Sequence, residues 1–243
     1  MPVWGHLWAR VRSAGPRRYF TAGDLLDTLM TGRDYDFWLL DLDGTVVDVR
    51  QPYVHEVVEE VGDRLGVGFT DLEANLIWYG PGRAREAMFA RRDVDSEAFW
   101  GVFHEVDRPE NRAEASYVYE DAAATVPDLS GPVGVVTHCQ EHLTGPVLEA
   151  LDIGDWFDTV VCCTHETGWK PDPTPVEMAI ADLGMRGARA GAMAGDGPRD
   201  VQAAHNAGLD GVHVARHDHL DHQTDDASLD GATRVRTLAD LWD

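Results

Sequence analysis

Two aspartates near residue 40 are the first side chains in this chain whose spacing could do chemistry. The wholly apolar run Phe37–Leu40 leads directly into the sequence DLDGT, in which Asp41 and Asp43 stand one residue apart. A strand buried on both faces reads as such an apolar run, and open parallel sheets place their chemistry beyond the carboxyl ends of their strands. The alternative is an acidic turn without a function, because short motifs also occur by chance.

A hydroxyl group follows an apolar run in the second half of the chain. Pro132–Val136 predicts a short buried strand that ends at Thr137, followed by His138 and Cys139. The threonine hydroxyl and the amide that follows it can hold phosphate oxygens at such a position. Threonine at a strand end also commonly caps the next helix, so this residue alone does not decide between the two roles.

The sequence contains a single lysine. Lysine and arginine together number 20, and Lys170 is the only lysine among them. It lies in the sequence WKPDP, after a strand predicted at Asp158–Cys163. A lysine retained at one position indicates a need for a compact ammonium that the planar guanidinium of arginine cannot meet. Chance survival of a surface lysine is the alternative, but the place after a strand favours a role in a site.

A second acidic pair follows a later strand. The predicted strand Ala190–Ala194 ends in GDGPRD, which places Asp196 and Asp200 four residues apart. Together with Asp41 and Asp43, these side chains could complete a site for a hard cation, because Mg²⁺ prefers carboxylate, carbonyl and water oxygens.

The elements between the first strand and residue 127 read as helices. The valines of the first predicted helix recur at the spacing of one helical face: Val54, Val57, Val58 and Val61. Further helices are predicted over 71–79, 83–91, 96–106 and 114–126, with glycine and proline breaks between them. The pattern indicates a helical module inserted after the first strand.

We therefore expect an α/β fold, a doubly wound, Rossmann-like parallel sheet with an inserted helical cap. Residues 1–49 and 127–243 would form the core domain, with 1–36 as an N-terminal extension, and 50–126 would form the cap. The cap loop carries Arg83 and Arg85, and arginines on a mobile cap could hold the far, often anionic end of a phosphorylated substrate. These arginines could equally pair with neighbouring carboxylates, since surface ion pairs are common and weak.

The four clusters resemble the four motifs of the haloacid dehalogenase superfamily. DLDGT at 41–45, Thr137, Lys170 in WKPDP and GDGPRD at 195–200 occur in the family's order, each after a predicted strand. The likeness spans about Phe37 to Asp200. The helical insertion after the first motif resembles the cap of the subgroup that contains phosphoglycolate phosphatase and beta-phosphoglucomutase.

The resemblance implies a phosphatase that hydrolyses a small phosphorylated metabolite through an aspartyl phosphate. Asp41 would attack the phosphorus, and Asp43 would protonate the leaving oxygen and then activate the hydrolytic water. Thr137, His138 and Lys170 would hold the phosphoryl group, with Arg83 and Arg85 as candidate substrate contacts on the cap. The resemblance also implies Mg²⁺, held by Asp41, the backbone carbonyl of Asp43, Asp196 and Asp200, the last directly or through water.

Other members of the superfamily can be weighed against this assignment. The dehalogenases lack the second aspartate, so Asp43 favours phosphoryl transfer. Phosphonoacetaldehyde hydrolases use a cap lysine as a Schiff base, whereas the single lysine here belongs to the third motif. A phosphomutase of the beta-phosphoglucomutase type would use the same Asp41 and Asp43 and stays an alternative. So does a catalytically silent binding or regulatory member, although the intact motif residues argue against it.

The charge of the chain is strongly acidic. Its formal net charge is −23, with 43 acidic residues. Such a surface argues against nucleic acid or an anionic membrane as a partner. The excess is spread along most of the chain, and we interpret it as the adaptation of an extreme halophile rather than as a local acidic patch.

The remaining features suggest a cytoplasmic protein without a second metal site. Three cysteines give no disulfide framework, no apolar run reaches the length of a membrane span, and the N-terminus lacks a signal-peptide pattern. The tract His217–His222 lacks zinc spacing, and Cys139, Cys162 and Cys163 read as core residues. The first twenty residues carry arginines and a helix-like apolar stripe, to which we assign no chemistry, and the sequence does not indicate an oligomeric state.

Overall fold

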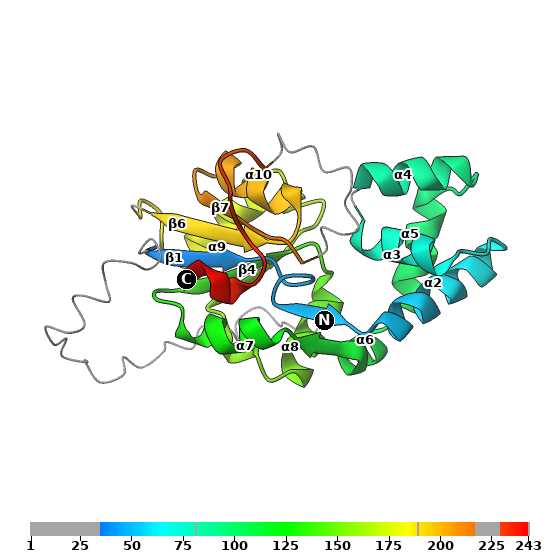
Figure 1. The fold of residues 1–243 in the computed structure, drawn as a ribbon, viewed down its shortest axis with the longest axis horizontal. Helices are drawn as coiled ribbons and strands as arrows, with labels where there is room; N and C mark the ends of the chain where they lie inside the picture. The colour runs from blue at the N-terminus through cyan, green and yellow to red at the C-terminus, as the bar shows by residue number, and fades with distance from the viewer. Residues whose placement is uncertain (1–34, 81, 189, 217–228, 243) are drawn as a thin grey trace, which may run out of the picture.

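Six parallel strands form one sheet in the computed structural model, which describes residues 35–80, 82–188, 190–216 and 229–242 (Figure 1). The strand order is β5-β4-β1-β6-β7-β8, which confirms the predicted doubly wound sheet. The strands are β1 (Phe37–Leu40), β4 (Val133–Thr137), β5 (Thr159–Cys162), β6 (Gly191–Gly195), β7 (Asp210–Val214) and β8 (Thr233–Val235). The helix-like apolar stripe of the first twenty residues and the tract His217–His222 lie outside the described residues.

Strand β1 lies between β4 and β6, at the point where the chain reverses its direction of travel across the sheet. All four of its residues are buried. Trp38 and Leu40 face one hydrophobic cluster, and Phe37 and Leu39 face another, because successive side chains of a strand point to opposite faces. The apolar run seen in the sequence therefore reflects burial on both sides.

Helices cover both faces of the sheet (Figure 1). One cluster contains residues of α7 (Glu120–Thr125), α8 (Glu141–Ala150) and the 3₁₀ helix η5 (Leu238–Trp242), and the other contains residues of α9 (Thr174–Asp182) and α10 (Pro198–Asn206). Two short 3₁₀ helices, η1 (Val126–Asp128) and η2 (Gly154–Trp156), complete this part. Among the described residues, no helix combines the length and apolarity needed to cross a membrane.

A two-stranded antiparallel stem, β2 (Val47–Val49) with β3 (Ser116–Val118), leads into and out of the helical insertion. The insertion consists of α2 (Gln51–Leu65), α3 (Asp71–Tyr79), α4 (Gly82–Arg91), α5 (Ser96–Val106) and α6 (Pro109–Ala115). Helices α2 to α5 share their own hydrophobic cluster, which includes the predicted valine stripe of α2. Helix α6 packs instead against α8 of the core. The domain limits at residues 50 and 126 stay a prediction.

The continuous helix predicted over 114–126 is wrong, because a strand interrupts it. Helix α6 ends at Ala115, and Ser116, Tyr117 and Val118 form β3 before the chain turns into α7. Their extended conformation is stabilised by pairing with Asp48 and its neighbours in β2, a contact between segments far apart in sequence. Local helix-like spacing is a weak preference that tertiary pairing overrides.

Candidate active site

The carboxyl edge of the sheet brings the four sequence motifs together. Asp41 follows β1, Thr137 ends β4 and Asp196 follows β6, while Lys170 comes from the loop between β5 and α9. Leu40 pairs with Val135 on one side and Ala194 on the other, so Asp41 emerges between β4 and β6. Ligand sites of open α/β sheets lie at this kind of switch point.

Lys170 is a buried cation at the centre of these residues, with 2% of its surface exposed. Its Nζ lies 2.8 Å from Asp41 Oδ1 and 2.6 Å from Asp200 Oδ1, and it donates a hydrogen bond of 2.9 Å to the Val136 carbonyl. Burial lowers the pKa of the ammonium, but the two carboxylates outweigh burial and raise it above its usual value. The two carboxylates thus favour the charged form of Lys170.

Three carboxylates, those of Asp41, Asp196 and Asp200, have oxygen atoms within 4.8 Å of one another. Burial, the largest cause, raises the pKa of Asp41 to about 7, with Lys170 opposing the rise and Asp200 adding to it. Burial and the two neighbouring carboxylates also raise the pKa of Asp196 well above its usual value. A bound divalent cation would reverse this balance by favouring the ionised forms.

This donor set fits Mg²⁺. Three carboxylates face one ammonium within the described residues, and oxygen donors in this number suit a hard cation that retains several water ligands. The side chain of Asp43 lies outside the group of three, so any contribution of this residue would come from its backbone carbonyl.

Two glycines leave room for the carboxylates. A Cβ at Gly44 would lie 2.3 Å from Asp196 Oδ2, and a Cβ at Gly195 would lie 2.3 Å from Asp200 Cγ. Gly44 also has a φ of +77°, in the left-handed region where a Cβ is disfavoured. The DLDGT turn thus brings its backbone close to the fourth motif.

Thr137 and His138 border the same edge. Thr137 is buried, and its Oγ1 accepts a hydrogen bond of 3.0 Å from the Cys139 amide. His138 lies beside Trp169, with ring centroids 5.5 Å apart. Burial, and then the charge of Lys170, lowers the pKa of His138 to about 3. The imidazole is therefore neutral near pH 7 and can offer one donor and one acceptor.

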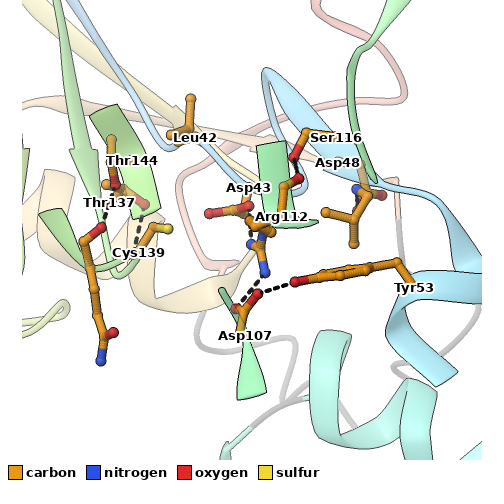
Figure 2. A network of polar contacts seen from close by, with 12 residues as sticks. Leu42, Asp43, Asp48, Tyr53, Asp107, Arg112, Ser116, Thr137, Cys139 and Thr144 are labelled. Carbon is orange, nitrogen blue, oxygen red and sulfur yellow. Dashed lines mark hydrogen bonds and ion pairs between the residues drawn. The ribbon is translucent and has the colours of Figure 1, made fainter. Parts of the chain in front are cut away.

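Sequence reasoning missed Arg112, which contacts the second aspartate of the first motif (Figure 2). Arg112 Nη2 lies 2.6 Å from Asp43 Oδ1, and Arg112 Nη1 lies 3.0 Å from Asp107 Oδ2. Asp107 in turn accepts a hydrogen bond of 2.6 Å from the Tyr53 hydroxyl. Arg112 belongs to no motif, so only the packing of α6 could have revealed it.

The two predicted cap arginines lie in different surroundings. Arg85 donates a hydrogen bond of 3.0 Å to the Ile77 carbonyl and lies 5.0 Å from the centre of the Trp100 ring. Burial, and then the nearby Arg199, lowers the pKa of Arg85. A Cβ at Gly82 would lie 2.6 Å from Arg199 Nη2, so the start of α4 lies against the fourth motif. Arg83 is exposed.

A cavity of about 1370 Å³ opens elsewhere, beside the β2–β3 stem. Its wall contains Asp48, Tyr79 and Tyr119, and the carboxylate of Asp48 accepts hydrogen bonds from both tyrosines, at 3.2 and 2.5 Å. None of the predicted catalytic or metal-binding residues lines this cavity. This cavity and the converging charged groups are therefore separate features of the described residues.

Comparisons with known proteins agree with the geometry. Residues 36–208 match the family model described as haloacid dehalogenase-like hydrolase. Pyrophosphatase PpaX of Bacillus velezensis is 29% identical over 191 residues, which cover 76% of this chain and 86% of that protein. Phosphoglycolate phosphatase of Escherichia coli is 27% identical over 198 residues, which cover 71% and 78%. A solved haloacid dehalogenase phosphatase from Thermococcus onnurineus has the same fold, with a TM-score of 0.58, 23% identity and coverage of 85% and 95%.

Proposed function

Since the chain belongs to the haloacid dehalogenase-like hydrolases, we propose that it is a Mg²⁺-dependent phosphatase that hydrolyses a small phosphorylated metabolite through an aspartyl phosphate. The observation that carries the proposal is the convergence of Asp41, Lys170, Asp196 and Asp200 at the switch point of the sheet. The curated relatives support it, because they include phosphoglycolate phosphatases, a pyrophosphatase and an N-acetylmuramic acid 6-phosphate phosphatase.

Asp41 is the proposed nucleophile. Its Oδ1 is held by the Leu42 amide at 2.8 Å and by Lys170 at 2.8 Å, which fixes the rotation of the carboxylate. In the first step a carboxylate oxygen attacks phosphorus while the bond to the leaving oxygen breaks. Asp43, entering the step protonated, gives its proton to that oxygen.

Asp43 then acts in the opposite direction. Its carboxylate takes a proton from a water molecule, the water oxygen attacks phosphorus, and inorganic phosphate leaves as the Asp41 carboxylate is restored. One residue thus serves as acid and base in turn, and the enzyme returns to its starting state with no other reactant than water.

The phosphoryl group needs positive charge and hydrogen-bond donors around it. Lys170 supplies charge from a buried position, and Thr137 and His138 border the same edge. Mg²⁺, held by Asp41, Asp196 and Asp200 with the Asp43 carbonyl, would neutralise the negative charge that develops on the transferring phosphoryl oxygens.

Arginines at the start of α4 are the proposed contacts for the distal part of the substrate. Arg85 lies close enough to Arg199 for the two charges to affect each other, and Arg83 lies in the same first turns of α4 as Arg85. Paired guanidinium groups suit a carboxylate or a second phosphate. The names of two relatives denote substrates with such a second anionic group, phosphoglycolate and pyrophosphate.

The proposal is tested by assaying a nitrophenyl phosphate and a panel of phosphorylated metabolites in molar KCl, with Mg²⁺ and with EDTA. We expect Mg²⁺-dependent release of inorganic phosphate and a loss on the order of 10⁴-fold or more in kcat for Asp41→Asn. Asp63→Asn, an exposed aspartate on α2, is the matched control and should retain full activity.

Two results would overturn parts of the proposal. Wild-type turnover by Asp41→Asn would remove the nucleophile assignment. Interconversion of sugar phosphates without phosphate release would instead identify the phosphomutase alternative.

A further inference from the structure

Arg112 lies where the helical insertion meets the catalytic turn, and its surroundings fix it from several sides. Its side chain is 6% exposed, and that of its partner Asp107 is 2% exposed. The guanidinium carbon lies 4.8 Å from the centre of the Trp78 ring. Asp107 follows α5, Tyr53 lies in α2 and Trp78 lies in α3, so three helices of the insertion hold one arginine in place.

The guanidinium of Arg112, fixed in this way, donates one hydrogen bond to Asp43. Asp43 is much more accessible than Arg112, with 32% of its side chain exposed. Among the described residues, Arg112 is the group that hydrogen-bonds its carboxylate, through Oδ1 at 2.6 Å. A partly exposed aspartate without such a partner samples several rotamers. Because Oδ1 is engaged, the other oxygen, Oδ2, is left for the proton that passes to the leaving group or comes from water.

Asp43 and Asp107 share Arg112 as their positively charged partner. Arg112 carries one positive charge against the carboxylates of Asp107 and Asp43. Asp107 is the more buried and is also satisfied by the Tyr53 hydroxyl, so it anchors the guanidinium whether or not Asp43 is charged. Arg112 can therefore keep its position while Asp43 gains and loses a proton.

We propose that Arg112 is a positioning residue that holds the Asp43 carboxylate in the orientation required for proton transfer. The inference rests on the proposed function, in which Asp43 is the acid and base. Misplacing a reacting group by about 1 Å costs on the order of 10²-fold in rate. If Arg112 acts only through Asp43, replacing Arg112 should not change the rate further once Asp43 can no longer transfer protons.

A double-mutant cycle tests this dependence. We expect Arg112→Met to lower kcat on nitrophenyl phosphate by on the order of 10²-fold, because the hydrolytic water then lacks an oriented base. In the Asp43→Asn background the same change should alter kcat by no more than about twofold. Arg64→Met removes an exposed arginine paired with Glu60 on α2, and this control should leave kcat unchanged in both backgrounds.

A second variant covers the case in which Arg112→Met fails to fold because Asp107 is left buried without its cation. Arg112→Met combined with Asp107→Asn removes both charges and retains an acceptor for the Tyr53 hydroxyl. Its kcat is then compared with that of Asp107→Asn alone, again with and without Asp43→Asn. Thermal unfolding of every variant shows whether the compared proteins are folded.

The leaving group gives an independent readout. The kcat/KM value reports the first step, in which an alkyl phosphate needs a proton from Asp43 and nitrophenyl phosphate does not. We expect Arg112→Met to lower kcat/KM on the order of 10²-fold for the alkyl ester and far less for the nitrophenyl ester.

Equal losses of kcat/KM on the two esters, or a loss of kcat in the Asp43→Asn background as large as in the wild-type background, would overturn the proposal and assign Arg112 to substrate binding or to structure. Failure of the proposed function would look different, because the wild-type protein would then release no phosphate from any ester.

Discussion

At the scale of single residues, the oxygen atoms around Lys170 explain why an ammonium suits this position. An ammonium has three donors that point away from one another, and Nζ meets three acceptors, Asp41 Oδ1, Asp200 Oδ1 and the Val136 carbonyl, at 2.6 to 2.9 Å. One hydrogen bond and two ion pairs with the protein therefore hold the ammonium. Lys170 would act on a bound phosphoryl group chiefly through its charge at close range.

Lys170→Arg should disable the enzyme although it keeps the charge. The guanidinium is larger and planar, and its fork cannot address three acceptors arranged around one point in a space that is almost fully buried. We expect a loss on the order of 10²- to 10³-fold in kcat, measured with nitrophenyl phosphate at saturating Mg²⁺.

The matched control is the opposite exchange at a surface site, Arg64→Lys on α2, whose arginine is 37% exposed. It should leave kcat at the wild-type value. Near wild-type turnover by Lys170→Arg would show that the single lysine of the sequence has no special role in the site.

At the scale of elements, the sequence predicts the parts of the site that come from strand ends. Apolar runs identified β1, β4 and β6, and α3 and α5 have the predicted bounds. Parallel strands end at a common edge, so the sequence alone suffices to place Asp41, Thr137 and Asp196 together. The phosphoglycolate phosphatase-like resemblance is confirmed by the family model and the relatives.

The parts that escaped prediction depend on contacts between distant segments. β3 is extended because it pairs with β2, which lies far earlier in the chain. The Arg112 to Asp43 contact likewise spans 69 positions and has no motif to mark it. Helix spacing and motif order carry no information about such pairings, so α6 and its arginine became visible only in the packed structure.

The close approach of the DLDGT turn to the fourth motif gives a prediction at this scale. Gly44→Ala would place a methyl group against Asp196 and impose a disfavoured φ. Placing a residue with a Cβ at this φ lowers the free energy of unfolding by about 1 to 2 kcal/mol. We expect that loss in the free energy of unfolding, and in addition at least a tenfold higher Mg²⁺ concentration for half-maximal activity, because Asp196 must move away.

Gly208→Ala separates these two effects. Gly208 has the same φ of +77°, but a Cβ there would meet nothing within 4 Å. It should show the loss of stability measured by denaturant unfolding, with the Mg²⁺ dependence of the wild type. If Gly44→Ala had the same Mg²⁺ dependence as Gly208→Ala, the turn would not be part of the cation site.

At the scale of the whole molecule, the acidic surface and the site have opposite requirements. The chain carries a formal net charge of −23, whereas its substrate is itself an anion under the proposed function. Lys170 supplies positive charge where the phosphate would bind, and Arg85 and Arg199 add positive charge near His138 at the same edge. Salt screens the long-range repulsion between exposed charges while affecting the buried Lys170 pairs much less.

The same charge predicts that concentrated salt stabilises the fold. Self-repulsion of a highly charged surface destabilises the compact state, and the Debye length falls from about 10 Å at 0.1 M salt to about 3 Å at 1 M. If salt screens this repulsion and so adds roughly 3 to 5 kcal/mol to the free energy of unfolding, the Tm of a chain of this size rises by on the order of 10 °C. We expect this rise between 0.1 and 2 M KCl in thermal unfolding, and a smaller one in sucrose of equal osmolality. An unchanged or lower Tm in 2 M KCl would contradict the interpretation of the composition as a halophilic adaptation.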